Sequence, residues 1–222
     1  MFRNYTIFTL ILAFITIPTL AQNSAWFDLN KDYKSGIELL EKGKYAAASN
    51  QFNRVLKNDQ KSNAKAEINP EVSLLKENTR YYIALCALEL GNSDAESLFQ
   101  SFISVNPANN FTKLAFYQVG RSYFALKNYP KVIEWLKKLE GTGLSGKESY
   151  EYRYKLAYSH FEIKEYDQAK ALFAELKDQK SIYNEQSIYY FAYVCYLQKD
   201  YKKALIEFER LKGSGLYEDS YP

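Results

Sequence analysis

The sequence predicts an all-α protein, a right-handed superhelical stack of about five antiparallel helix hairpins. Two observations lead to this fold. Nearly the same amphipathic segment recurs at 129–139 (YPKVIEWLKKL), 166–176 (YDQAKALFAEL) and 201–211 (YKKALIEFERL). A second apolar helical pattern, with a small residue near its middle, precedes each of these segments. Regular self-similarity of this kind is typical of repeat arrays, in which neighbouring units bury a shared core.

The composition is that of a folded chain. Its 222 residues include only 9 Gly and 5 Pro, and 25% of them are charged, which argues against disorder. Aromatic residues reach 17%, with 21 Tyr and 14 Phe. The net charge of +3 is too small to indicate a nucleic-acid surface, so we expect no nucleic-acid partner.

The first 21 residues have the pattern of a secretory signal. Arg3 is followed by an apolar run through Ile17, and Thr19-Leu20-Ala21 forms a small-x-small cleavage site. We therefore predict a signal peptide at 1–21, a lead at 22–32 and an exported protein, periplasmic or associated with the outer membrane. An uncleaved anchor is the alternative, but the apolar run is short for a bilayer span. We expect no membrane span after cleavage.

The second helix of each predicted hairpin has apolar core positions at i, i+3 and i+4 spacing, which places them on one helix face. These core positions are Tyr45, Ala48, Phe52 and Val55; Ala95, Phe99 and Phe102; Tyr129, Val132, Leu136 and Leu139; Tyr166, Ala169, Phe173 and Leu176; and Tyr201, Ala204, Phe208 and Leu211.

The first helix of each predicted hairpin has a small residue in its middle, which allows two helices to cross closely. The small residues are Gly36, Ala84, Gly120, Ala157 and Ala192. Each first helix ends in a short polar turn: Gly43-Lys44, Gly91-Asn92, Lys127-Asn128, Lys164-Glu165 and Lys199-Asp200. The longest connection, at 57–72, is polar and contains Pro70, and we predict that it is a mobile loop.

Taken together, these small residues, the aromatics that open the second helices and the alanines that follow them resemble the tetratricopeptide repeat, a helix pair of about 34 residues. The resemblance covers about 33–211. It departs from the family at Arg153, where a bulky apolar residue is usual, and in retaining the unit-ending proline only near Pro107. We assign 33–212 to the repeat array and 213–222 to the start of a further repeat or a tail.

The segment GTGLSGKES at 141–149 is close to a phosphate-binding loop, but two features count against that function. Glu148 stands where a Ser or Thr should hold magnesium, and the segment follows a helix rather than a strand. LKGSGLYEDSY at 211–221 repeats the same motif at the same place in the unit. We therefore predict that these glycines are helix stops. No obvious polar cap closes the last unit, so further repeats C-terminal to Pro222 are expected.

The sequence offers no set of catalytic residues, and we predict that the protein is not an enzyme. His160 is the only histidine, and it takes the position that Tyr123 and Cys195 hold in neighbouring copies, which favours a packing role. One histidine with two distant cysteines cannot form a structural zinc site. We expect no metal, no cofactor and no disulfide between Cys86 and Cys195.

A second aromatic stripe follows the first helices, about one residue around from their core positions. Its residues are Tyr81; Tyr117, Arg121 and Phe124; Tyr154, Tyr158 and Phe161; and Tyr189, Tyr193 and Tyr196. The resemblance implies that this side of each first helix faces the concave groove of the array. Aromatic rings with polar tips are suited to binding an extended peptide, and Arg121 could pair with a carboxylate. The alternative is that these rings pack only within the array.

We predict a non-catalytic protein–protein interaction scaffold of the cell envelope, which binds a peptide or protein segment in the aromatic groove. Two alternatives remain open. The chain could be a structural spacer or assembly subunit of an envelope complex, in which its ends matter more than its groove. It could also bind glycans, because tyrosine rings stack on sugars.

Overall fold

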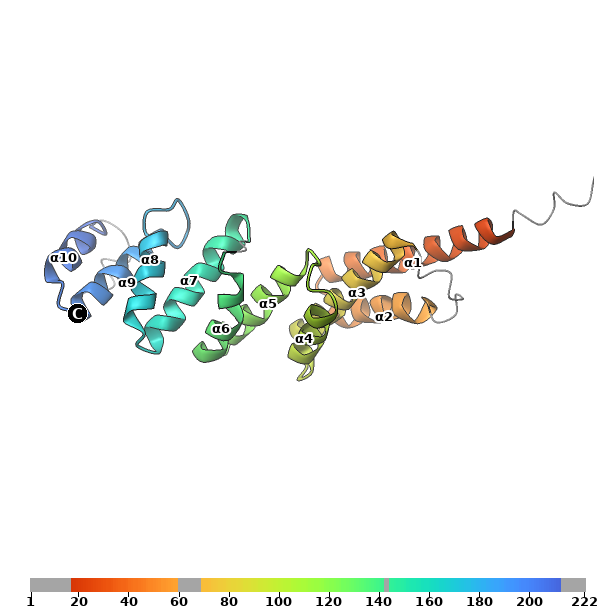
Figure 1. Ribbon diagram of the computed structural model, residues 1–222, viewed down its shortest axis with the longest axis horizontal. Coiled ribbons are helices and arrows are strands. Elements are labelled where there is room, and N and C mark those ends of the chain that lie inside the picture. Colours follow the sequence, from red (N-terminus) through yellow and green to blue (C-terminus); the bar gives the residue numbers. More distant parts are fainter. Residues whose placement is uncertain (1–16, 60–68, 142–143, 213–222) are drawn as a thin grey trace, which may run out of the picture. The chain divides into compact units, whose positions relative to one another are not determined.

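The computed structural model describes the backbone of residues 17–59, 69–141 and 144–212 (Figure 1), and the side chains from Asp28 onward within these ranges except those of residues 58 and 59. Every regular element in these ranges is a helix, which confirms the predicted all-α fold for the described residues. The helices are α1 (Ile17–Glu41), α2 (Tyr45–Asp59), α3 (Pro70–Glu89), α4 (Ala95–Val105), α5 (Thr112–Ala125), α6 (Tyr129–Leu136), the 3-10 turn η2 (Lys137–Leu139), α7 (Gly146–Glu162), α8 (Tyr166–Leu176), α9 (Asn184–Leu197) and α10 (Tyr201–Glu209).

The helices fall into two compact units. Unit 1 is residues 1–107 and contains the hairpins α1–α2 and α3–α4. Unit 2 is residues 108–222 and contains the hairpins α5–α6, α7–α8 and α9–α10. Within each unit, every helix packs against the next one along the chain, so the hairpins follow one another serially. The predicted set of five hairpins is thus present as two in one unit and three in the other.

The predicted core positions of the second helices are buried with few exceptions. Phe52 in α2, Phe99 in α4 and Phe173 in α8 are fully buried, and Leu136 in α6 is equally inaccessible. The exceptions are Phe208 of α10, which is half-buried, and the tyrosines that open these helices. Tyr201 is 58% exposed, so the first position of the pattern lies at the rim of the core and not inside it.

The small residues of the first helices permit the predicted close crossings. A Cβ added to Gly36 in α1 would lie 2.5 Å from the ring of Phe52 in α2, closer than van der Waals contact allows. A Cβ on Gly120 in α5 would overlap the Leu136 side chain in the same way. Within each hairpin, the second helix therefore occupies the space that a side chain at this position would need.

The turn after each first helix has one backbone conformation in all five hairpins. A residue with positive φ ends the helix at Gly43 (67°), Gly91 (71°), Lys127 (55°), Lys164 (65°) and Lys199 (64°). In the third such turn of unit 2, the Lys199 N–H donates to the Tyr196 carbonyl oxygen and the Asp200 N–H donates to that of Cys195, both at 2.9 Å. This pair of bonds satisfies carbonyls that the end of a helix would otherwise leave without a donor.

The connection predicted as a loop at 57–72 is shorter than expected. α2 continues to Asp59 and α3 begins at Pro70, where Asn69 caps the helix by accepting from the Glu71 N–H at 2.9 Å. A proline in the first helical turn needs no N–H partner, so it begins this helix instead of excluding one. The remaining part of the predicted loop, 60–68, lies outside the described residues.

The structure describes only part of the N-terminal region for which predictions were made. α1 begins at Ile17, and it runs through the predicted cleavage position after Ala21 and the predicted lead at 22–32. Residues 1–16, which include Arg3 and most of the apolar run, lie outside the described residues. No described helix combines the length and apolar character needed to cross a membrane. The predicted further repeat or tail at 213–222 also lies outside the described part.

The glycine-rich segment after α6 is a turn between helices. Gly141 has φ of 73° and follows η2, as predicted for a helix stop. Gly146 also has positive φ, but it opens α7, so the prediction that it ends a helix was wrong. Residues 142–143 and the matching glycines after 212 lie outside the described residues.

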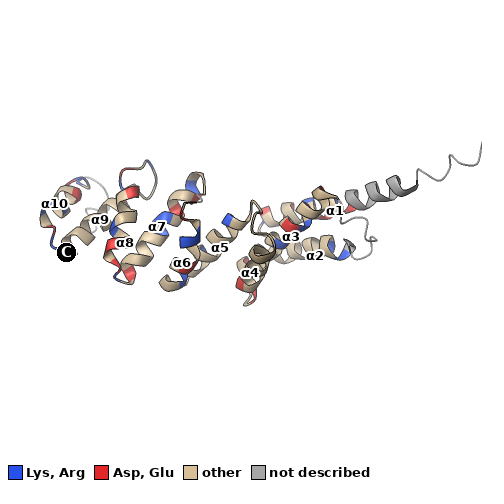
Figure 2. Cartoon of the chain, in the orientation of Figure 1, with Lys and Arg blue, Asp and Glu red and all other residues tan. Residues whose placement is uncertain are grey.

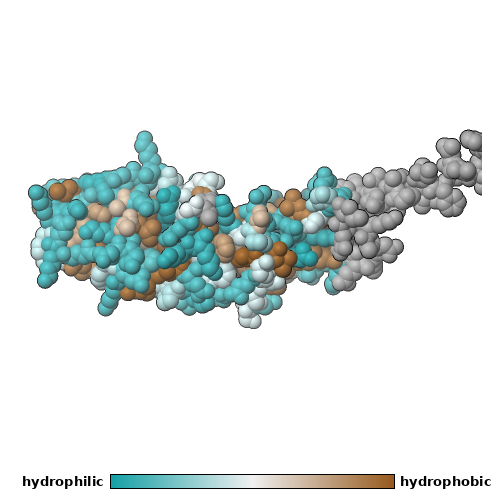
Figure 3. All heavy atoms as spheres, viewed as in Figure 1, coloured by the Kyte–Doolittle hydropathy of each residue, from teal (hydrophilic) through white to brown (hydrophobic). Residues whose placement is uncertain are grey.

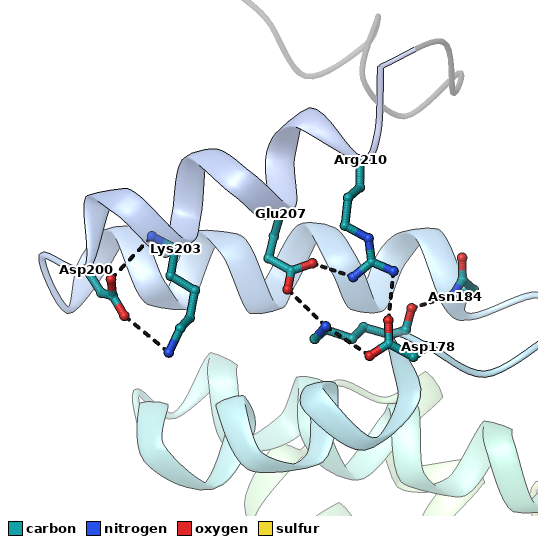
Figure 4. Close-up of polar contacts among 7 residues, drawn as sticks. Asp178, Asn184, Asp200, Lys203, Glu207 and Arg210 are labelled. Atoms are coloured by element: carbon teal, nitrogen blue, oxygen red, sulfur yellow. Dashed lines mark hydrogen bonds and ion pairs between the residues drawn. The ribbon is translucent and has the colours of Figure 1, made fainter.

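A polar network that the sequence analysis missed holds α10 to the end of α8 (Figure 4). Glu207 of α10 is buried, and its carboxylate accepts from the Lys177 ammonium at 2.9 Å and the Arg210 guanidinium at 2.6 Å. Arg210 also pairs with Asp178 at 2.7 Å. Trp135 occupies the corresponding position of α6 and is fully buried, so the last hairpin uses ion pairs where an earlier hairpin uses an apolar ring.

Candidate partner-binding surface

The structure brings most of the predicted stripe together in unit 2. Phe124, Tyr154, Tyr158, Phe161, Tyr189 and Tyr193 are half-buried, whereas Arg121 and Tyr196 are exposed and Tyr81 and Tyr117 are buried. The first helices α5, α7 and α9 supply all of the half-buried and exposed members. Half-burial leaves each ring one edge or face for another molecule, while the remainder packs within the unit.

Five of these side chains form a continuous row, which we call the aromatic ladder: Phe124, Tyr158, Phe161, Tyr193 and Tyr196. Ring centroids along it are 5.7 Å (Phe124–Tyr158), 6.2 Å (Tyr158–Phe161), 5.8 Å (Phe161–Tyr193) and 6.5 Å (Tyr193–Tyr196) apart. These distances are typical of favourable aromatic pairs. The aromatic ladder therefore links three successive hairpins of unit 2 through direct ring contacts.

The contacts of the aromatic ladder repeat from hairpin to hairpin. The last aromatic of one first helix packs against a tyrosine in the middle of the next, as Phe124 does with Tyr158 and Phe161 with Tyr193. Tyr196 holds the same place at the end of α9 and is 53% exposed. The ladder thus ends in an accessible ring.

A second feature was missed by the sequence analysis. The tyrosine that opens each second helix of unit 2 packs edge-on or tilted against the ladder ring that ends the preceding first helix. The ring pairs are Phe124–Tyr129, Phe161–Tyr166 and Tyr196–Tyr201, at 6.2, 6.0 and 5.6 Å. The regular recurrence of Tyr129, Tyr166 and Tyr201 after each polar turn was the signal available in the sequence. These tyrosines were interpreted as core residues, and in the structure they widen the aromatic surface.

The tyrosine hydroxyls beside the ladder remain protonated far above neutral pH. Burial raises the pKa of Tyr158, and its interaction with the Glu162 carboxylate raises the pKa further. Burial also raises the pKa of Tyr154 and that of Tyr190, whose ring lies 5.1 Å from both Tyr158 and Phe161. Neutral hydroxyls can both donate and accept hydrogen bonds, which is useful for binding a peptide backbone.

Charged groups at the α5–α7 end of the ladder are balanced. The Lys155 ammonium lies 4.2 Å from the centroid of the Phe124 ring and 3.5 Å from the Glu151 carboxylate. Arg121 lies over the Tyr117 ring, 6.0 Å from its centroid. The cations here already have aromatic or carboxylate neighbours, so the surface is not a strongly charged one.

Tyr81 and Tyr117 are not accessible, which corrects their assignment to a binding surface. Tyr81 is 3% exposed and packs in unit 1 against Phe99 and Phe102, with ring centroids 5.9 and 5.8 Å away. Tyr117 is 4% exposed and belongs to the core cluster that includes Leu136 of α6. Both are packing residues, because the neighbouring helices close over these two rings.

His160 has the packing role that was predicted. It is buried, and its Nδ1 atom lies 2.6 Å from the Glu165 carboxylate across the α7–α8 turn.

Cys86 and Cys195 are buried free thiols, and burial raises the pKa of Cys86 to about 11 and also raises that of Cys195. Among the described residues, no group of three or more His, Cys, Asp or Glu side chains is placed to hold a metal ion.

Charge and hydropathy are mixed over the surface. Lys and Arg, and likewise Asp and Glu, are scattered over the helices of both units (Figure 2). On the face drawn in Figure 3, hydrophilic residues predominate over the part that contains α6–α10, and hydrophobic residues form patches between them. The aromatic ladder is rich in tyrosine, so its surface combines apolar rings with polar tips.

Comparison with known proteins supports the helical-repeat fold. Residues 151–179, which include most of α7 and all of α8, match the model of the tetratricopeptide repeat family. No curated protein sequence matches the chain. Several solved structures match the chain. MamA of AMB-1 has a TM-score of 0.62 at 13% identity, covering 88% of this chain and 98% of that one.

Two further structures have the same helical fold. A putative kinesin light chain of Podosopora anserina with nearly identical TPR-like repeats has a TM-score of 0.56 at 12% identity, over 83% of this chain and 92% of that one. Pseudomonas aeruginosa PilF has a TM-score of 0.54 at 14% identity, over 91% of this chain and 79% of that one. Sequence identities this low establish likeness of fold alone.

Proposed function

We propose that this chain, which has the tetratricopeptide-repeat fold, is a non-catalytic scaffold that binds an extended protein segment along the aromatic ladder of unit 2. The observation that supports this function most directly is the continuity of the ladder. Half-exposed rings from α5, α7 and α9 contact one another in a row that ends at exposed Tyr196. A row that crosses three hairpins fits a linear ligand better than a compact one.

The ladder also favours a particular ligand chemistry. Its rings offer contact area at a small cost in side-chain entropy, and its tyrosine hydroxyls can bond to a peptide backbone. Lys155, Glu151 and Glu162 flank the ladder with charges of both signs, so the ligand needs no high net charge. A segment with apolar or aromatic side chains separated by exposed backbone fits this surface.

The cell envelope is the location that the proposal assigns to this scaffold. Its basis is the sequence pattern of residues 1–21, with Arg3, an apolar run and a small-x-small site. Cell fractionation combined with N-terminal sequencing tests it directly. A mature protein that begins at Gln22 in the periplasmic or outer-membrane fraction is the expected result, and an unprocessed cytoplasmic protein would contradict the location.

The binding function is tested by selecting peptides from a random display library on the purified chain and measuring their affinity by calorimetry. Tyr196→Ala and Tyr193→Ala should each weaken a selected peptide by about tenfold or more, because exposed aromatic anchors dominate such interfaces. The free energy of unfolding should change by less than about 1 kcal/mol for Tyr196→Ala, since its ring is largely exposed.

Tyr150→Ala is the matched control, because Tyr150 is a half-buried tyrosine of α7 that contacts Arg153 and lies outside the ladder. The Tyr150→Ala variant should bind the same peptide with the affinity of the unmodified chain. Selected ligands whose affinity is insensitive to Tyr193 and Tyr196 would overturn the assignment of the ladder. A glycan array is screened in parallel. Binding of sugars there, with no peptide selected from the library, would show that the ligand is a glycan and not a peptide.

A further inference from the structure

One face of α10 is exposed and unusually apolar. Lys202, Leu205, Ile206 and Glu209 are spaced at i, i+3, i+4 and i+7, so they share one side of the helix. All four are exposed, with Leu205 at 62% and Ile206 at 54%. We call these four residues the α10 face. Two adjacent, exposed branched aliphatic side chains indicate an interaction surface more strongly than a single one does.

The other second helices do not share this feature. The residues that correspond to Leu205-Ile206 are Ser49-Asn50 in α2, Glu96-Ser97 in α4, Ile133-Glu134 in α6 and Lys170-Ala171 in α8. None of these pairs has two large apolar side chains. The repeat fold therefore does not need them here, and the α10 face requires another explanation.

The orientation of the α10 face is fixed from the opposite side of the helix. Glu207 and Arg210 point toward the end of α8, where they pair with Lys177 and Asp178 (Figure 4). Ala204 is buried on the same inner side of α10. The helix cannot rotate to bury Leu205 and Ile206 without breaking these ion pairs.

We propose that the α10 face binds the same face of a second copy of this chain, and that the protein forms a two-fold symmetric dimer through antiparallel α10 helices. The charges of the face are self-complementary in that arrangement. A two-fold axis between Leu205 and Ile206 places Lys202 opposite Glu209 of the partner subunit, and Glu209 opposite the partner subunit's Lys202. The same axis places Leu205 against the partner's Ile206.

Self-complementarity of this kind is what a closed two-fold interface requires, because each contact is made twice. Neither Lys202 nor Glu209 is in an ion pair with any other described residue, so both side chains are available for it. A helix of 9 residues offers little area, and the dimer should therefore be weak and concentration-dependent. The α10 face shares no residue with the aromatic ladder, so different variants test dimer formation and peptide binding.

Sedimentation equilibrium of the purified full chain, at concentrations up to about 100 μM, tests the dimer. We expect a reversible monomer–dimer equilibrium that Leu205→Lys and Ile206→Glu each abolish. Leu74→Lys is the control, because Leu74 is a comparably exposed leucine on α3, and the equilibrium should be unchanged. Circular dichroism should show native helix content in all of these variants, since the altered side chains are exposed.

Charge exchange gives a sharper test of the antiparallel arrangement. Lys202→Glu or Glu209→Lys alone places like charges opposite each other twice, and each should weaken the dimer by about tenfold. The double variant Lys202→Glu/Glu209→Lys restores opposite charges and should recover dimerisation. A mixture of the two single variants should form heterodimers in preference to either homodimer.

Three outcomes would overturn the proposal. The first is a chain that stays monomeric at every concentration. The second is a dimer that Leu205→Lys leaves intact, and the third is a double charge exchange that dimerises no better than the single variants. Lys147→Glu, at an exposed position of α7, controls for the change in net charge and should leave the equilibrium unaffected.

Discussion

A residue with left-handed backbone conformation ends the first helix in all five hairpins. In unit 2 this residue is a lysine each time. Lys127, Lys164 and Lys199 have φ between 55° and 65°, whereas unit 1 has Gly43 and Gly91 at these places. A side chain in this region of the backbone map costs about 1–2 kcal/mol, which glycine avoids. Glycine in turn loses more backbone entropy on folding, by about 0.5–1 kcal/mol.

Lys164→Gly should therefore raise the free energy of unfolding, by about 0.5–1 kcal/mol, as the difference between these two effects. Urea denaturation followed by circular dichroism measures it. Gly91→Ala is the reverse change at the equivalent turn of unit 1 and should destabilise the protein. No atom lies within 4 Å of the added Cβ there, so any loss reports backbone strain and not crowding. A destabilised Lys164→Gly variant would contradict the account of the turn.

The small residues in the first helices make a different kind of prediction. Gly120→Ala should destabilise the protein by about 1–3 kcal/mol, because its Cβ would overlap the fully buried Leu136 side chain. Denaturant unfolding measures the loss. The double variant Gly120→Ala/Leu136→Ala should lose less than the sum of the two single changes, since the shorter side chain leaves room for the methyl group. Strict additivity would argue against a direct contact.

Residues of this kind were predictable from the sequence because their role is local. A glycine or alanine in the middle of a repeated helix indicates a close crossing, and a polar pair before a second helix indicates a turn. The exposure of the aromatic stripe was less predictable. Helical spacing places Tyr117 and Tyr154 on one face, but only the packing of neighbouring helices decides that Tyr117 is buried and Tyr154 half-buried. Tyr81 was misassigned for the same reason.

At the level of single helices, sequence periodicity located the second helices closely, and most of their predicted core positions are buried, the opening tyrosines and Phe208 being the exceptions. The first helices were harder to delimit. The start of α3 at Pro70 was missed because a proline in a polar segment resembles a loop, although proline also suits the first turn of a helix. The burial of Glu207 was missed because its partner Lys177 comes from the preceding hairpin.

The network around α10 makes stability depend on pH. Hydrogen bonds from Lys177 and Arg210 lower the pKa of Asp178 in the folded state. A lowered pKa means that the ionised form stabilises the fold. This contribution is present above the unfolded-state pKa, about 3.9 for an aspartate, and is lost as the pH falls through the lower folded-state value.

Asp178→Asn should consequently be less stable than the unmodified chain at pH 7, and the difference should shrink as the pH falls below about 4. Urea denaturation at a series of pH values measures both curves. Glu185→Gln serves as the control, because this exposed carboxylate of α9 is in no ion pair with another described residue. A difference that grows on acidification would show that Asp178 does not stabilise the fold through its charge.

Across unit 2, local repetition becomes a continuous surface. The hairpins supply one, two and two rings in turn, and contact between rings of successive first helices joins them into the aromatic ladder. The sequence predicted which residues form the stripe, since they recur at fixed places in the repeat. It could not show that the ladder ends at an exposed Tyr196, or that Tyr129, Tyr166 and Tyr201 extend it sideways. Those features depend on how the hairpins pack.

Site-specific photo-crosslinking in the producing cells tests the central claim, that the aromatic ladder is where a protein partner binds. A photoreactive phenylalanine analogue replaces Tyr196 in one variant and Ala171, an exposed residue of α8 outside the ladder, in another. Crosslinks from position 196 to a defined segment of a partner protein, and none from position 171, are the predicted result. Equal crosslinking from both positions, or crosslinking from 171 alone, would contradict it.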